Sequence, residues 1–176
     1  MEDTLISVIA IALAVILMFV FPLMTMSDRA DDVAQLTVEV ATTEFVDEIR
    51  TTGKITPDEY SKFLENIGST GNTYNIEMEI KIQDENPDRK ITMVSRGEQI
   101  GENAYYSIYT SQIENVLNAD SDNIYKLKEG DIISVSVNNT NQTLSQQLKN
   151  FFYTVIGKDT YTIAASHGGK VTATGK

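Results

Sequence analysis

The stretch that decides the fold is LISVIAIALAVILMFVFPLM, residues 5–24, which contains no charged side chain. At about 1.5 Å per residue a helix of this length spans about 30 Å, the thickness of the hydrocarbon core of a bilayer. The run is apolar on every side of such a helix, and covering it inside a protein requires a much larger partner domain than the rest of the chain can form. We therefore expect residues 1–26 to be an N-terminal transmembrane segment.

The residues that flank this segment indicate whether it is cleaved or retained, and they bear on its orientation in the membrane. Met1 to Thr4 contain no Lys or Arg, unlike the basic start of a cleaved signal peptide, so we expect the segment to be retained. The positive-inside rule gives no orientation, because neither flank is enriched in Lys or Arg. Since long acidic domains are translocated regardless of local charge, we expect the head outside the cytoplasm of a single-pass cell-membrane protein, with the lipid bilayer as its first partner.

Composition excludes several classes of function. The chain has 14 basic and 25 acidic residues, a formal net charge of -11, and no cluster of Lys or Arg. A nucleic-acid partner is therefore not expected. The chain has no cysteine, so disulfides, thiolate metal sites and cysteine nucleophiles are excluded.

An apolar stripe continues beyond the membrane segment. It consists of Ala34, Val38, Ala41, Phe45 and Ile49, flanked by Val33, Leu36, Val40 and Val46. Spacings of three and four are typical of an amphipathic helix, and Gly53 suits the left-handed position just past its end. We expect one helix from Leu5 to Thr52, kinked at Pro22. Its second part, residues 27–53, should pack on the chain's own sheet.

Residues 54–176 show strand and helix patterns in irregular order, which predicts an α+β head with a mainly antiparallel sheet and two or three short helices. The predicted helices are Pro57 to Ile67, Asn103 to Leu117, and a helix that begins after Thr143 and ends at Gly157. The predicted strands are Tyr74 to Ile82, Lys90 to Ser95, Gly130 to Val137, Tyr161 to Ala165 and, after a turn at Gly168-Gly169, Val171 to Thr174. Capping boxes are predicted at Thr56 and Thr143.

Two groups of apolar and aromatic side chains on the predicted helices are expected to be buried. Tyr105, Tyr106 and Tyr109 would lie on one helix, where aromatic residues at this spacing are more often core than a surface ladder. The last helix should turn one face inward, formed by Leu144, Leu148, Phe151, Phe152 and Val155.

Residues suited to catalysis are scarce. His167 is the only histidine, and it precedes a predicted turn, so we expect a solvated turn residue and not a general base. The sequence has no phosphate loop, dinucleotide fingerprint, nucleophile elbow or zinc-ligand spacing. We expect neither an enzyme nor a cofactor.

One stretch has the spacing of a calcium loop. Asn118, Asp120, Asp122 and Glu129 occupy positions one, three, five and twelve of an EF-hand pattern. However, the first position is normally Asp, Tyr125 replaces an aliphatic residue, and a strand is predicted after Glu129 where a helix is required. We expect an ordinary turn without metal, with calcium as the weaker alternative.

The layout resembles type IV pilin-like proteins, and it looks like the TadE-type pseudopilins of tight-adherence pilus systems. The resemblance lies in the apolar run, Pro22, the amphipathic continuation and the strand-rich head, together with the phrases FVDEIRTTGKIT (45–56), GDIISV (130–135) and GGKV (168–171). It implies a non-enzymatic subunit, a minor or initiating component of an adhesion or secretion filament. Its partners would be copies of itself, sister subunits and an assembly platform.

Under this resemblance the membrane helix is a packing element. Ser7, Ala10 and Ala14 share one helix face and would be points of close approach, and Pro22 would belong to the same subunit-packing segment; the alternative is that these small residues have no packing role. Glu2 or Asp3 would pair with another subunit's N-terminal amine, or else both simply lie in cytoplasmic water. The alternative function is a monomeric, membrane-tethered binding or sensor domain outside the cytoplasm.

Overall fold

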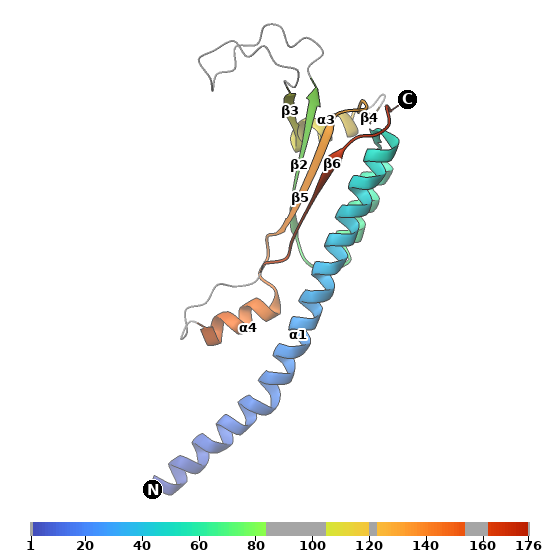
Figure 1. Ribbon diagram of the computed structural model, residues 1–176. Coiled ribbons are helices and arrows are strands. Elements are labelled where there is room, and N and C mark those ends of the chain that lie inside the picture. The colour runs from blue at the N-terminus through green and yellow to red at the C-terminus, as the bar shows by residue number, and fades with distance from the viewer. Residues whose placement is uncertain (1, 84–104, 120–122, 154–161, 176) are drawn as a thin grey trace, which may run out of the picture.

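A computed structural model describes residues 2–83, 105–119, 123–153 and 162–175. The elements are α1 (Glu2–Thr52), β1 (Lys54–Ile55), α2 (Pro57–Gly68), β2 (Tyr74–Gln83), β3 (Tyr105–Tyr109), α3 (Thr110–Leu117), β4 (Tyr125–Lys126), β5 (Ile132–Asn139), α4 (Leu144–Tyr153) and β6 (Ala164–Lys170). One long helix reaches out of a small head (Figure 1). The predicted α+β class is confirmed.

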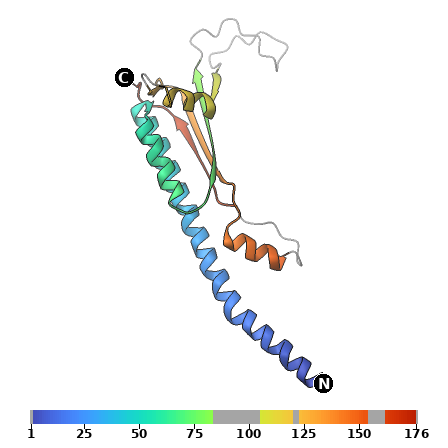
Figure 2. The same cartoon turned by 180° about the vertical axis from the view of Figure 1, so that it is seen from behind.

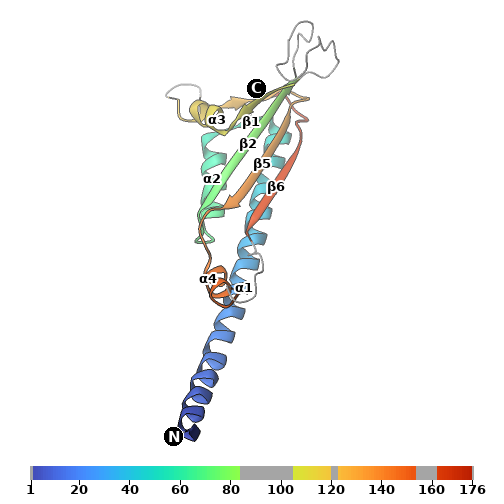
Figure 3. The ribbon, with the colours of Figure 1, turned by 90° about the vertical axis from the view of Figure 1, so that its left-hand side faces the viewer.

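The main sheet has four strands in the order β3-β2-β5-β6, and every neighbouring pair is antiparallel. A second, two-stranded sheet joins β1 to β4. Alternate residues of β2 and β5 are buried, among them Ile80, Ile133 and Val135. Figure 3 shows α1 and α2 behind one face of the main sheet. The period-two patterns of the sequence therefore mark the face that these helices cover.

The amphipathic half of α1 forms the centre of the core. Its predicted stripe is buried, at Ala34, Val38, Ala41, Phe45 and Ile49, together with the flanking Val46. The Phe45 ring stacks on Phe63 of α2, with 4.5 Å between ring centroids. The other flanking residues remain outside the core: Val33, Leu36 and Val40 are 65%, 61% and 46% exposed.

Pro22 does not interrupt α1, which is helical from Glu2 to Thr52. Figure 2 shows the helix curving gradually along its free half, where the sequence predicts a kink. The other end stops as expected: Gly53 has a φ of 70°, and its N–H donates to the Ile49 carbonyl at 2.8 Å. A Cβ at Gly53 would lie 2.2 Å from the Ala173 carbonyl oxygen, so only glycine lets the C-terminal segment pass here.

The two predicted capping boxes are present. Thr56 Oγ1 accepts from Glu59 N–H at 3.2 Å and the Glu59 carboxylate accepts from Thr56 N–H at 3.0 Å. At α4, Thr143 Oγ1 accepts from Gln146 N–H at 3.2 Å and Gln146 Oε1 accepts from Thr143 N–H at 3.1 Å. Each box satisfies donors that a helix start otherwise leaves free.

The predicted helix from Asn103 to Leu117 is wrong over its first half. Residues from Tyr105 to Tyr109 form strand β3, which pairs with β2 from Glu79 to Gln83, and the helix begins only at Thr110. Aromatic and β-branched residues favour a pleated surface when a partner strand is available. The three tyrosines of this strand are exposed, not core.

The predicted turn at Gly168-Gly169 is also wrong, because β6 runs straight through both residues. A Cβ at Gly168 would lie 2.9 Å from the Ile133 carbonyl oxygen, and one at Gly169 would lie 2.6 Å from Arg50 Nε. These glycines permit close approach of β5 and of the Arg50 side chain. His167 is consequently a strand residue and not a turn residue.

The prediction that Leu144 faces inward is wrong: it is 52% exposed, on a helix α4 that projects sideways from the head beside α1 (Figure 1). Other predictions lie outside the residues that the structure describes. These are the strand from Lys90 to Ser95, the inward position Val155 and the helix end at Gly157; Leu148, Phe151 and Phe152 belong to α4, but the structure does not describe their side chains.

We predict that Phe45→Asp lowers the free energy of unfolding by about 3 kcal/mol or more, because it places a charge where a buried ring stacks on Phe63. Urea unfolding of the full chain in detergent measures the change. Leu36→Asp on the same helix is the matched control and should leave the unfolding midpoint nearly unchanged. Equal midpoints for Phe45→Asp and wild type would contradict the assignment of this stripe to the core.

Candidate functional site

The free half of α1 is the largest exposed apolar surface among the described residues. Its side chains from Leu5 to Met26 are exposed except for the partly buried Val20 and Met24, and its length and hydropathy are sufficient to cross a membrane. Ser7, Ala10 and Ala14 are exposed on this helix, as is Asp3. The Ser7 hydroxyl donates to the Asp3 carbonyl at 2.8 Å, so Ser7 needs no polar partner from another helix. The small side chains on this face would allow the backbone of a neighbouring helix to approach closely.

Just past the membrane segment, two acids of α1 meet the start of α4. Thr143 Oγ1 donates to Asp31 Oδ2 at 2.7 Å, and the Ser145 hydroxyl donates to the Asp28 carboxylate. Asp31, Thr143 and Ser145 are buried, at 8%, 6% and 1% exposure. Carboxylates are favoured here because the first turn of a helix carries partial positive charge. This contact holds the membrane-proximal end of the head on α1.

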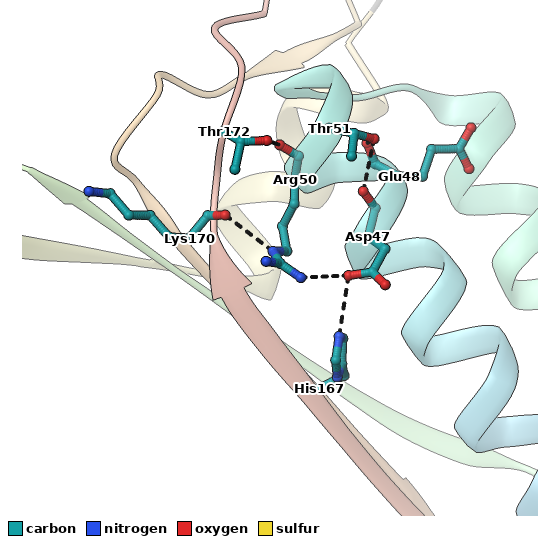
Figure 4. Close-up of polar contacts among 7 residues, drawn as sticks. All are labelled: Asp47, Glu48, Arg50, Thr51, His167, Lys170 and Thr172. Carbon is teal, nitrogen blue, oxygen red and sulfur yellow. Dashed lines mark hydrogen bonds and ion pairs between the residues drawn. The ribbon is translucent and has the colours of Figure 1, made fainter.

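A second polar junction joins α1 to β6 at the far end (Figure 4). Arg50 Nη1 lies 2.7 Å from Asp47 Oδ1, and Arg50 Nε–H donates to the Lys170 carbonyl at 3.1 Å. His167 Nε2 lies 3.4 Å from the same Asp47 oxygen. The Thr172 N–H and hydroxyl both donate to the Arg50 carbonyl, at 2.8 and 3.0 Å. The lone histidine therefore belongs to a contact between helix and sheet.

The hydrogen bond from Arg50, aided by that from His167, lowers the pKa of Asp47 below its ordinary value of 3.8, against a smaller opposing effect of burial. The contact therefore favours the ionised carboxylate. Sequence reasoning missed this junction, although Asp47 and Arg50 lie three residues apart on one helix. Only the position of β6 brings His167 to them.

The calcium-loop residues are only partly described. Asn118 is the C-terminal cap of α3, and Glu129 lies in the turn before β5, with its N–H donating to Thr174 Oγ1 at 3.1 Å. Asp120 and Asp122 lie outside the described residues. Within the described part of the chain, no group of three or more His, Asp or Glu could hold a metal ion.

A groove with a volume of about 790 Å³ lies beside strand β2. We call it the β2 groove, and its walls include Tyr60, Leu64, Ile76, Glu77, Glu79 and Glu114. The Tyr60 hydroxyl donates to Glu114 Oε1 at 2.7 Å. Burial, and secondly this hydrogen bond, raise the pKa of Tyr60 well above its ordinary value of 10, so the hydroxyl keeps its proton at neutral pH. Sequence reasoning did not find this groove, because it depends on where β3 stops.

Comparisons of the chain with protein-family models, with curated proteins and with solved structures find no match. Its function therefore has to be inferred from the exposed helix, the two polar junctions and the β2 groove.

We predict that the stabilising effect of Asp47 depends on pH in the acid range. Because the folded-state pKa lies below the unfolded value of 3.8, the contribution is complete above that value and is lost as the pH falls through the folded-state pKa. The unfolding midpoints of wild type and Asp47→Asn should differ at pH 6 and converge toward pH 2.5. Glu44→Gln, exposed on the same helix, is the control. A difference that is unchanged at pH 2.5 would show that the carboxylate charge is not involved.

We predict that Thr143→Ala destabilises the head by about 2 kcal/mol, because it removes a helix cap and leaves the buried Asp31 without its hydroxyl partner. Thr143→Ser should retain most of the stability. Thr37→Ala is the control, since that hydroxyl donates to the Val33 carbonyl within its own helix. Denaturant unfolding compares the four proteins, and equal midpoints for Thr143→Ala and wild type would refute the role of this junction.

Proposed function

We propose that this chain is a non-enzymatic, pilin-like subunit. A single pass of α1 anchors it in the cell membrane with the head outside the cytoplasm, and α1 then packs with other subunits in an adhesion or secretion filament, in which the chain is a minor or initiating component. Its partners are the lipid bilayer before assembly, and afterwards copies of itself or sister subunits and an assembly platform.

The observation that carries this proposal is an apolar face of α1 that extends past the membrane end. Val33, Leu36 and Val40 lie three and four residues apart, so they share one side of the helix, and all three are exposed while the stripe beside them is buried in the head. A lone subunit leaves this face in water. A neighbouring helix packed along α1 would cover it together with the membrane half.

The two polar junctions support the same role. They hold both ends of the amphipathic half of α1 to the head, so a subunit that packs through α1 carries its head in a defined position.

The second function, a monomeric tethered binding domain, is favoured by the β2 groove. The two proposals differ in whether α1 associates with other chains.

We predict that the double substitution Ala10→Leu with Ala14→Leu disrupts association in the membrane without preventing insertion, because it fills the close-approach face and makes the segment more apolar. Crosslinking in membranes of the native host compares the variant with wild type. Ala12→Leu, on the opposite side of the helix, is the matched control and should behave like wild type. Leu36→Asp tests the face above the membrane and should also reduce crosslinking while the head stays folded.

A wild-type chain that remains monomeric in those membranes, with no copurifying subunit or platform protein, would refute the filament role. Loss of crosslinking in Ala12→Leu as well would mean that the small residues do not define the contact face.

A further inference from the structure

Strand β2 is longer than its neighbour β3. β2 covers Tyr74–Gln83, but β3 pairs only with Glu79 to Gln83, after which the chain turns into α3. On the other side, β5 pairs with β2 from Tyr74 to Lys81. Within the described residues, the segment from Tyr74 to Met78 is therefore an edge of the sheet, and it lines the β2 groove.

The register shows which peptide groups face this edge. Thr140 N–H donates to the Thr73 carbonyl at 2.8 Å, so Tyr74 and Asn139 form a non-hydrogen-bonded pair of the β2–β5 ladder. The N–H and C=O of Tyr74, and by alternation those of Ile76 and Met78, consequently point away from β5.

Only Met78 has a partner there among the described residues. Its N–H donates to Thr110 Oγ1 at 2.7 Å, and the same hydroxyl lies 3.4 Å from the Met78 carbonyl oxygen. The peptide groups of Tyr74 and Ile76 face the groove. An extended segment laid along this edge would satisfy them as a further strand.

The two sides of the groove differ in chemistry. On the helix-covered side of the sheet, the Tyr60 ring and Leu64 of α2 form an apolar surface, with Leu64 39% exposed, and the Glu114 carboxylate lies at the edge of this surface, where it accepts from the Tyr60 hydroxyl. On the opposite side, Glu77 and Glu79 project from alternate positions of β2. Glu79 also accepts from the Ser107 hydroxyl at 2.7 Å and lies 3.8 Å from Lys81 Nζ, so Glu77 is the acid with no cation beside it among the described residues. No Lys or Arg belongs to the lining given by the described residues. A strand presents alternate side chains to these two walls.

We propose that the edge of β2 from Tyr74 to Met78 binds an extended basic segment of a partner protein as an added strand. Apolar side chains at alternate positions of this segment pack on Tyr60 and Leu64. Lys or Arg at the intervening positions lie near Glu77 and Glu79. The backbone supplies the pairing, and the two walls supply the specificity.

A second copy of this chain is the less suitable occupant. Pairing two β2 edges would bring Glu77 and Glu79 of one chain close to those of the other, and like charges across strands are destabilising. The chain as a whole carries a net charge of -11, which favours a basic partner at long range. This inference does not depend on the filament role.

The probes are eight-residue peptides with Lys or Arg at four alternate positions and Val, Leu or Phe at the others, each with a scrambled version of the same composition. Binding to the full chain in detergent is followed by fluorescence anisotropy. Alternating peptides should bind saturably, and Glu77→Lys with Glu79→Lys should weaken binding by about tenfold or more. Glu44→Lys with Glu48→Lys, two exposed acids of α1 outside the groove, is the matched control and should retain binding.

Amide hydrogen exchange tests the strand geometry itself. Bound peptide should slow exchange at Tyr74 and Ile76 by about tenfold or more, while the amides of Asn75 and Glu77, which face β5, should change little. The proposal is overturned if no peptide of the panel binds, if scrambled peptides bind equally, or if binding leaves Tyr74 and Ile76 exchange unchanged. Protection of these two amides that rises with protein concentration in the absence of peptide would assign the edge to a second copy, and would also overturn it.

Discussion

The head depends on the need to keep one side of a helix out of water. From Ala34 to Ile49, α1 presents an apolar stripe that a lone helix would expose, and each large side chain removed from water contributes about 1.5 to 3 kcal/mol. The antiparallel sheet covers this stripe, because the alternating residues of its strands place one apolar face of the sheet against it. The stacked rings of Phe45 and Phe63 add α2 to the same core. Of the strands of the main sheet, β5 and β6 lie against α1, and β2 lies farther from it; part of the β2 edge is uncovered because β3 pairs only with Glu79 to Gln83.

Polar groups then determine where along the helix the sheet is placed. Ala34, Val38 and Ala41 offer similar surfaces at successive turns, so this part of the stripe fixes the position of the sheet less strictly than the larger Phe45 and Ile49 do. The buried Asp31, held by Thr143, and the backbone of Lys170, held by Arg50, are each satisfied at one position only. Gly53 and Gly169 also require this one position of the sheet along α1, because a larger side chain at Gly53 would clash with the Ala173 carbonyl and one at Gly169 would clash with the Arg50 guanidinium.

Local patterns predicted what depends on neighbours in sequence. The stripe of α1, the two capping boxes, the left-handed Gly53 and the alternation of β2 follow from spacings of two to four residues, and the structure agrees with them. The predictions are wrong where a segment distant in the sequence determines the secondary structure. Tyr105 to Tyr109 pair with β2, and Gly168 lies against β5, although neither partner is visible from nearby residues. The β2 groove and the Asp47–His167 contact could not be predicted for the same reason, because both exist only once the strand order is known.

The orientation of β6 along α1 has a mechanical consequence. Their main contacts run side by side along the helix, from Gln35 with Ala164 to Arg50 with Lys170. A force pulling α1 along its axis therefore loads these contacts in shear, in parallel, and does not open them one after another from an end. Rupture then requires many of them to fail together, whereas a sideways pull on the C-terminal segment near Thr172 would peel the same interface step by step. The head should resist axial tension far better than lateral tension.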